Sequence, residues 1–97
     1  MDKIYTIEEI NAFINVLKKN LNMDFYFESL YSDEINKNMQ YLDVLRKITD
    51  TTINHGILSK TNLIDELNNE IIKYNDSGEE ITYCIEAINE FINILNT

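Results

Sequence analysis

The chain has 97 residues, of which 17 are acidic and 8 are basic, so its net charge is −9. A chain of this length forms one domain around one core, and its 44% hydrophobic content argues against a disordered protein. Because it contains no proline and only two glycines, it lacks the turn residues that a strand-rich fold needs. We therefore expect an all-α bundle of about four helices, with residues 1–97 forming a single domain.

The first helix is predicted at 7–21. Thr6 and Glu9 have the spacing of a capping box, and Tyr5 and Ile10 have that of a hydrophobic staple. At the helical period, one face is apolar, formed by Ile7, Ile10, Phe13, Ile14, Leu17 and Leu21.

Residues 24–31 hold the densest aromatic cluster of the chain. Met23, Phe25 and Phe27 alternate with polar or amphipathic residues, which is the period of a strand. A single strand would have no partner within this chain, so we expect a short aromatic helix or a turn.

The second helix is predicted at 33–54, with His55-Gly56 as its stop. It carries two adjacent apolar stripes. The first consists of Ile35, Met39, Leu42, Leu45, Thr49 and Ile53, and the second of Tyr41, Val44 and Ile48. An arc this wide places the helix at the centre of a bundle or gives it a face for a partner. Tyr41, Val44 and Ile48, together with Phe25, Tyr26 and Tyr31, are the candidates for a homodimer contact or second interface.

Two further helices are predicted at 61–75 and 79–95, antiparallel because the turn Asp76-Ser77-Gly78 between them is short. Ser77 and Glu80 have the spacing of a second capping box. The last helix has one apolar face, formed by Ile81, Cys84, Ile85, Ile88, Phe91, Ile92 and Leu95. Its opposite edge carries Glu79, Tyr83, Glu86 and Glu90, and the helix contains no Lys or Arg. This edge is the candidate partner-binding site, the alternative being a solvated surface.

Catalytic and metal-binding patterns are missing from the sequence. Cys84 and His55 are the only soft metal ligands, too few for a structural zinc site, and Cys84 on an apolar face is expected to be a buried thiol. There is no Gly-rich phosphate loop, and the pairs Glu66/Glu70 and Glu86/Glu90 do not match the magnesium motifs of helical pyrophosphohydrolases. We expect no enzyme activity, no metal and no cofactor.

The charge distribution predicts the class of partner. Residues 61–97 carry eight acids and one base, Lys73. Because of this negative charge, the C-terminal part of the chain is expected to repel nucleic acid and anionic membranes and to attract a basic protein surface. With neither a signal peptide nor an apolar run of membrane length, we expect a cytoplasmic protein.

These observations predict a small acidic interaction protein that inhibits or neutralises a basic, nucleic-acid-handling partner. Phage inhibitors of host defence, including the anti-CRISPR type, and immunity proteins of nuclease toxins are examples of this class. The alternative is an oligomeric helical binder or sponge for a small molecule such as a nucleotide. In that case the aromatic residues at 25–31 would line a pocket between subunits, and Lys18, Lys19 or Arg46 would meet the anionic ligand.

Overall fold

Four α-helices make up the fold in the computed structural model, which describes residues 2–21, 32–78 and 81–97. They are α1 (Ile7–Lys18), α2 (Ser32–Thr49), α3 (Lys60–Asp76) and α4 (Thr82–Leu95), and a π-helical turn, η1 (Asp50–Asn54), extends α2. No strand is present in the described ranges. The predicted all-α bundle is confirmed, whereas the predicted aromatic helix or turn at 24–31 lies outside the described residues.

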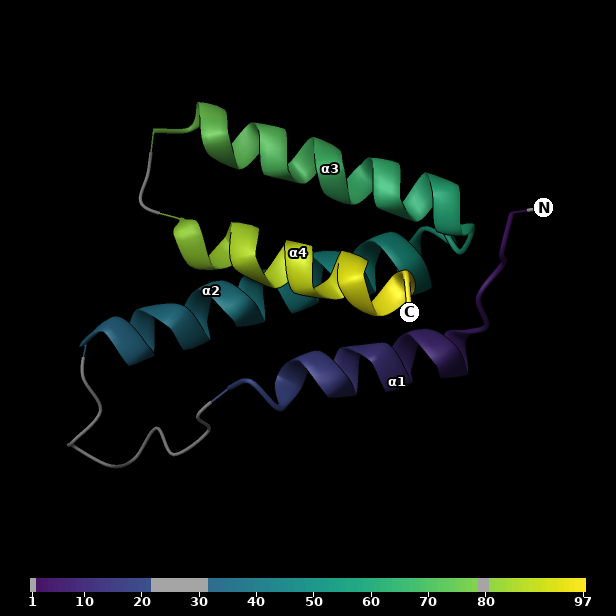
Figure 1. The fold of residues 1–97 in the computed structure, drawn as a ribbon, viewed down its shortest axis with the longest axis horizontal. Coiled ribbons are helices and arrows are strands. Elements are labelled where there is room, and N and C mark those ends of the chain that lie inside the picture. Colours follow the sequence, from purple (N-terminus) through teal and green to yellow (C-terminus); the bar gives the residue numbers. More distant parts are fainter. Residues whose placement is uncertain (1, 22–31, 79–80) are drawn as a thin grey trace.

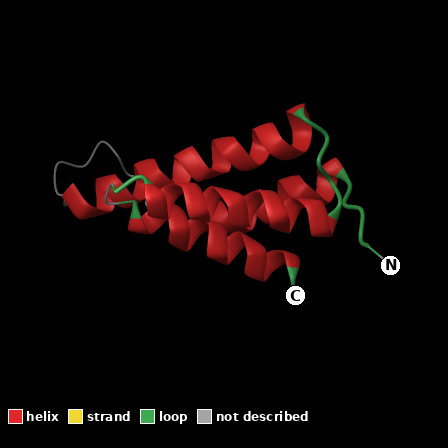
Figure 2. Ribbon diagram, turned by 90° about the horizontal axis from the view of Figure 1, so that it is seen from above, coloured by secondary structure: helices red, strands yellow, loops and turns green. Residues whose placement is uncertain are grey.

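Helix α4 occupies the middle of the bundle. In Figure 1 it lies between α3 and α1 with α2 behind it, and it packs against all three (Figures 1 and 2). Its inward side chains Ala87, Ile88 and Phe91 are at most 1% exposed. The apolar face that the sequence predicts for α4 is therefore buried in the core, and its burial stabilises the bundle through the hydrophobic effect.

Helix α1 begins as predicted and ends early. Thr6 Oγ1 accepts a hydrogen bond from the Glu9 amide at 3.1 Å, and Glu9 Oε1 accepts one from the Thr6 amide at 3.1 Å. The helix ends at Lys18, because the next three amides bond to carbonyls three residues back. Leu21 remains buried in the core even though it lies beyond the helix.

The two stripes of α2 have unequal roles. Tyr41, Val44 and Ile48 are at most 1% exposed and pack in the core. In the other stripe, by contrast, Met39 is 64% exposed and Ile35 is 40% exposed. Tyr41, Val44 and Ile48, which are also candidates for a homodimer contact or second interface, are thus covered by other helices of the same chain.

The predicted start of the last helix is also wrong. Ser77 ends α3 instead of beginning α4, and its hydroxyl donates to the Tyr74 carbonyl at 2.7 Å. Gly78 follows with a φ of +71°, and α4 begins only at Thr82, with Ile81 as an N-cap that offers no side-chain hydrogen bond. The missing cap comes from α2, where Gln40 Oε1 accepts from the Cys84 amide at 3.0 Å.

The N-terminal segment is anchored to the far end of the bundle. Tyr5 donates its amide to the Leu58 carbonyl at 2.9 Å and its hydroxyl to the Leu95 carbonyl at 3.1 Å. Asp2 caps the start of α3 by accepting from the Thr61 amide at 3.0 Å. These bonds hold the beginning of the chain against both α3 and the end of α4. Across the described ranges, no helix has the length and apolar character needed to cross a membrane.

Candidate functional site

The predicted acidic edge lies along the outer side of α4. Glu86 is exposed, while Tyr83 and Glu90 are half-buried. Glu79 lies outside the described residues. The three described members border a shallow groove of about 420 Å³, which we call the α4 groove. The described residues that line it are Thr82, Tyr83, Ile85, Glu86, Asn89, Glu90 and Asn93.

The carboxylates of this groove have no cationic partner among the described side chains. Neither Glu86 nor Glu90 forms an ion pair there, although Glu90 Oε2 accepts a hydrogen bond from Asn20 Nδ2 at 2.6 Å. On the neighbouring helix α2, Lys37 Nζ lies 5.9 Å from the centre of the Tyr83 ring. Two like charges at i and i+4 therefore stand side by side without neutralisation.

Tyr41 connects the acidic edge with the stripe of α2 that the sequence treats as a separate candidate. Its side chain is fully buried, and its hydroxyl has no hydrogen-bond partner within the described ranges. Burial raises the pKa of this hydroxyl far above its usual range, and the negative charges of Glu90 and Glu86 raise it further. The charges of both carboxylates of the α4 groove therefore act on the Tyr41 hydroxyl, although Tyr41 is not among the residues that line the groove. The other members of the proposed second interface, Phe25, Tyr26 and Tyr31, lie outside the described residues.

A second polar cluster joins α2 to α3, and here the charges are paired. Lys47 Nζ lies 3.7 Å from Asp43 Oδ2 and 3.5 Å from Glu70 Oε2, and it also donates to the Tyr74 hydroxyl. The Tyr74 hydroxyl in turn donates to Asp43 Oδ2 at 3.3 Å. Since each member is satisfied by another, this cluster holds two helices together. The sequence indicates that Asp43 and Lys47 can pair, because they are four residues apart on one helix. It does not indicate that Tyr74 of α3 joins them.

Next to this cluster is a wider hollow of about 510 Å³ with Cys84 at its edge. Its lining residues are Asn36, Met39, Gln40, Asp43, Arg46, Tyr74, Ile81 and Cys84. Cys84 is 2% exposed, and burial raises the pKa of its thiol. The expectation of a buried thiol is confirmed, and a protonated thiol is a weak nucleophile. His55 is exposed, and its Nδ1 lies 2.9 Å from the carbonyl of Asp50, the first residue of η1.

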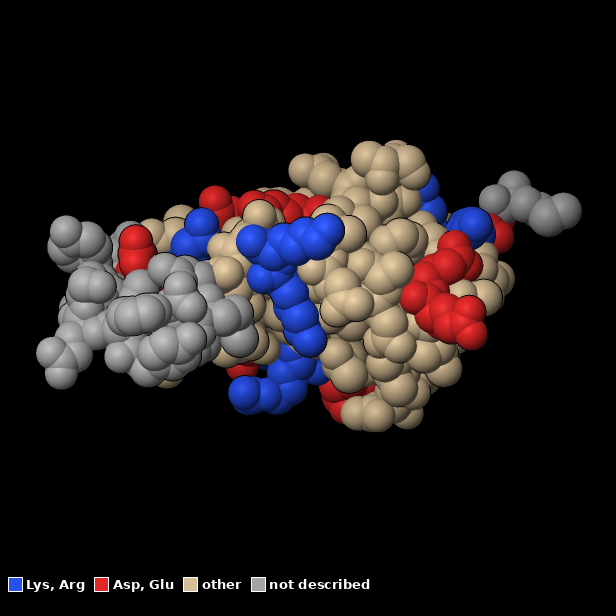
Figure 3. All heavy atoms as spheres, turned by 90° about the horizontal axis from the view of Figure 1, so that it is seen from below, with Lys and Arg blue, Asp and Glu red and all other residues tan. Residues whose placement is uncertain are grey.

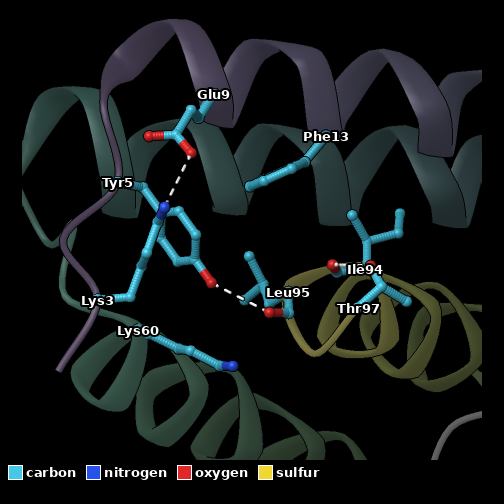
Figure 4. Close-up of a pocket in the computed structure, with 8 residues that line it drawn as sticks. All are labelled: Lys3, Tyr5, Glu9, Phe13, Lys60, Ile94, Leu95 and Thr97. Atoms are coloured by element: carbon cyan, nitrogen blue, oxygen red, sulfur yellow. Dashed lines mark hydrogen bonds and ion pairs between the residues drawn. The ribbon is translucent and has the colours of Figure 1, made fainter. Parts of the chain in front are cut away.

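A small hollow of about 240 Å³ lies between the N-terminal segment and the end of α4. Figure 4 shows that Lys3 turns toward Glu9, with which it pairs at 3.5 Å, while Lys60 extends into the hollow. The Tyr5 hydroxyl forms part of its wall. This hollow is the most cationic of those described, and it is smaller than a typical ligand pocket of about 300–1,000 Å³.

The surface charge is unevenly distributed on one face of the molecule (Figure 3). On the face shown in Figure 3, Lys and Arg side chains gather across the middle, and a group of acidic side chains lies toward one end. A basic partner would be repelled by the middle of this face, so it needs another surface to dock on.

No group of three or more His, Cys, Asp or Glu side chains in the described part of the chain could hold a metal ion. Searches of protein-family models, of curated proteins and of solved structures found no match to this chain.

Proposed function

We propose that the protein binds a basic surface of a nucleic-acid-handling partner through the α4 groove, and thereby inhibits or neutralises that partner. One observation carries the proposal. Glu86 and Glu90 border an open groove, and no Lys or Arg of the described residues pairs with them. A basic side chain from a partner would relieve their repulsion and gain two carboxylate acceptors.

The fold supports this role by making the groove rigid. Helix α4 packs against the three other helices, so its outer edge is held without the need to order a loop on binding. Preorganisation of this kind lowers the entropic cost of association. A half-buried tyrosine, Tyr83, beside the carboxylates adds contact area of the type that is enriched in protein interfaces.

The net charge supports a role in inhibition. A protein with a charge of −9 is attracted to a basic groove from a distance, which accelerates association at low ionic strength. Carboxylates held on a rigid helix can then occupy a site that normally takes phosphates. Phage anti-defence inhibitors and nuclease immunity proteins both act in this way on partners inside the cell, so a cytoplasmic location is part of the proposal.

The alternative function, a nucleotide binder formed by an oligomer, has less support in the described structure. Its aromatic pocket residues lie outside the described ranges, and of the cations assigned to its ligand, Arg46 lines the hollow of about 510 Å³ together with the acidic Asp43. The homodimer rested on the wide apolar arc of α2, whose Tyr41, Val44 and Ile48 are covered within the chain. Oligomeric state therefore remains a prediction, to be measured by light scattering.

The test compares two variants with the same change in net charge. Glu86→Gln with Glu90→Gln removes the charges of the groove, and Asp65→Asn with Glu66→Gln removes two exposed charges on α3. Each protein is immobilised and exposed to a lysate of the source cells, and captured proteins are identified by mass spectrometry. The affinity and association rate of the main captured protein are then measured at several salt concentrations.

We expect the wild type and the α3 variant to capture the same basic protein, and the groove variant to bind it at least about tenfold more weakly. The association rate of the wild type should fall as salt rises. Equal binding by both variants would contradict the proposal, as would capture of a partner without a basic surface.

A further inference from the structure

The hollow between the N-terminal segment and the end of α4 contains a lysine whose position the bundle does not explain. Lys60 is the first residue of α3, it is half-buried, and its side chain extends into the hollow (Figure 4). The helix dipole disfavours a cation at the N-terminus of a helix, and partial burial of an ammonium group costs further free energy. A half-buried charge in a protein therefore calls for a partner of opposite charge.

The Lys60 ammonium group has no such partner among the described residues. Its side chain forms no ion pair there, and it lies over none of the described aromatic rings. Its backbone is held in place, because the Lys60 amide donates to the Lys3 carbonyl at 2.7 Å. The pairing of the N-terminal segment with the start of α3 thus fixes where the lysine enters the hollow.

The carbonyl groups at the end of α4 already have donors. The Leu95 carbonyl accepts from the Tyr5 hydroxyl at 3.1 Å. The Ile94 carbonyl accepts from the Thr97 hydroxyl at 2.7 Å. These acceptors on the wall of the hollow are therefore satisfied without Lys60.

The acidic side chain of the hollow is also engaged. Glu9 Oε2 pairs with Lys3 at 3.5 Å, and Glu9 Oε1 accepts from the Thr6 amide at 3.1 Å. The charged side chains among the described lining residues are two lysines and this one glutamate. Since Glu9 is paired with Lys3, the positive charge of Lys60 is left over, in a hollow whose wall includes the apolar ring of Phe13.

We propose that this hollow binds a small organic acid, whose carboxylate pairs with the Lys60 ammonium group and whose apolar body lies against Phe13 and Leu95. The hollow of about 240 Å³ exceeds the cavity of about 150 Å³ that holds benzene in another protein, so a molecule of the size of benzoate fits. Lys3, at the same hollow, adds a second positive charge. The site shares no lining residue with the α4 groove and does not depend on the proposed function.

The experiment uses benzoate and propionate as probes, with benzamide as the uncharged analogue of benzoate. A glutamate capped at both ends of its backbone tests the other source of a carboxylate, an acidic side chain of a partner protein. Each compound is titrated into the isotope-labelled protein at constant ionic strength and followed by NMR. The proteins are the wild type, Lys60→Gln, Lys60→Arg and the matched control Lys73→Gln, which removes an exposed charge near the other end of α3. Thermal unfolding of each free protein is measured alongside.

We expect both free acids, but not benzamide, to shift the signals of the Lys60 side chain and of the residues that line the hollow. Lys60→Gln should weaken benzoate binding at least about tenfold, as expected for the loss of a hydrogen bond to a charged group. Lys60→Arg should stay within about threefold of the wild type because it keeps the charge, and Lys73→Gln should bind like the wild type. Free Lys60→Gln should melt at the same temperature or higher, since it removes an unpaired cation from the first turn of a helix.

Several results would overturn the inference. They are equal binding of benzoate and benzamide, equal affinity of Lys60→Gln and the wild type, and a lack of binding by both free acids. Tighter binding of the capped glutamate than of the free acids would overturn a small acid as the ligand. Should Lys60→Gln not fold, the Lys60 side-chain signals of the wild type still decide, because signals that stay unchanged at saturating benzoate contradict the ion pair.

Discussion

At the scale of single residues, Gln40 shows how one side chain can replace a missing helix cap. It lies in α2, is 9% exposed, and accepts from the Cys84 amide at 3.0 Å in the first turn of α4. The other end of its amide donates to Asn36 Oδ1 at 3.1 Å. Because the N-cap Ile81 has no side-chain acceptor, Gln40 supplies the bond that serines and threonines usually provide.

We predict that Gln40→Met lowers the free energy of unfolding by about 1 kcal/mol, near the lower limit for a lost buried hydrogen bond. Methionine keeps the length and most of the volume, and the Cys84 amide retains its bond to the Ile81 carbonyl at 3.0 Å. Urea denaturation measures the change. Asn36→Ala is the control, because it removes only the exposed partner and should cost less. A larger loss for Asn36→Ala would show that Gln40 does not cap α4.

The two caps also show which contacts a sequence can predict. The pair of Thr6 and Glu9 is separated by three residues, so its geometry follows from the helix itself. Gln40 and Cys84 are separated by 44 residues, and nothing in the local pattern around either one indicates the other. Ser77 has the right spacing for a cap, but it serves the preceding helix. Local spacing predicts a candidate cap and cannot say which helix uses it.

At the scale of elements, the end of η1 depends on the backbone of Gly56. Its φ is +72°, and the amides of His55, Gly56 and Ile57 bond to the carbonyls of Asp50, Thr52 and Thr51 in η1 at 3.0–3.1 Å. A Cβ at this position would meet no atom within 4 Å, so the cost of any side chain there comes from the backbone alone.

We predict that Gly56→Ala lowers the free energy of unfolding by about 1–2 kcal/mol, the cost of a left-handed conformation for an ordinary residue. Gly56→Asn should cost less, because asparagine tolerates this conformation better. Thermal unfolding of the two variants measures the difference. The reverse order, with alanine the milder change, would mean that the turn relaxes to a negative φ.

Helix periodicity predicts the elements better than it predicts their faces. Each of the four helices repeats its apolar residues at the helical period, which is why all four were predictable. In α2 both stripes satisfy this period, and only contact with α4 and η1 shows that Val44 is buried while Met39 is exposed. The π-helical turn after Thr49 could not be predicted from the sequence either, because its residues continue the apolar pattern of α2.

At the scale of the whole molecule, the candidate site combines a part that could be predicted with one that could not. Tyr83, Glu86 and Glu90 share an edge of one helix, and that follows from their spacing alone. Tyr41 lies on another helix, and it approaches Glu86 and Glu90 only because α2 packs against α4. The packing thus brings together two helices whose stripes look independent in the sequence.

Packing has another consequence for the whole molecule, in its response to alkaline pH. Burial is the main reason that the pKa values of Cys84, Tyr5, Tyr41 and Tyr74 are raised above the ordinary values of 9.0 for the thiol and 10.0 for the phenols. In the unfolded chain these groups lose their protons at the ordinary values, while in the folded chain they keep them. Above those values the folded state therefore binds more protons, and stability falls as pH rises.

We predict that the free energy of unfolding is steady up to about pH 8.5, falls from about pH 9 as the thiol ionises in the unfolded chain, and falls more steeply above about pH 10 as the phenols follow. A fully buried phenol such as Tyr41 contributes at most about 1.4 kcal/mol per pH unit, so Tyr41→Phe should reduce the slope above pH 10 by up to that amount. Urea denaturation across this range measures the slope, and tyrosinate absorbance reports ionisation. An unchanged slope in Tyr41→Phe, or ionisation of all tyrosines near pH 10 while the protein is still folded, would show that the hydroxyl is reached by water and that α2 and α4 do not seal it.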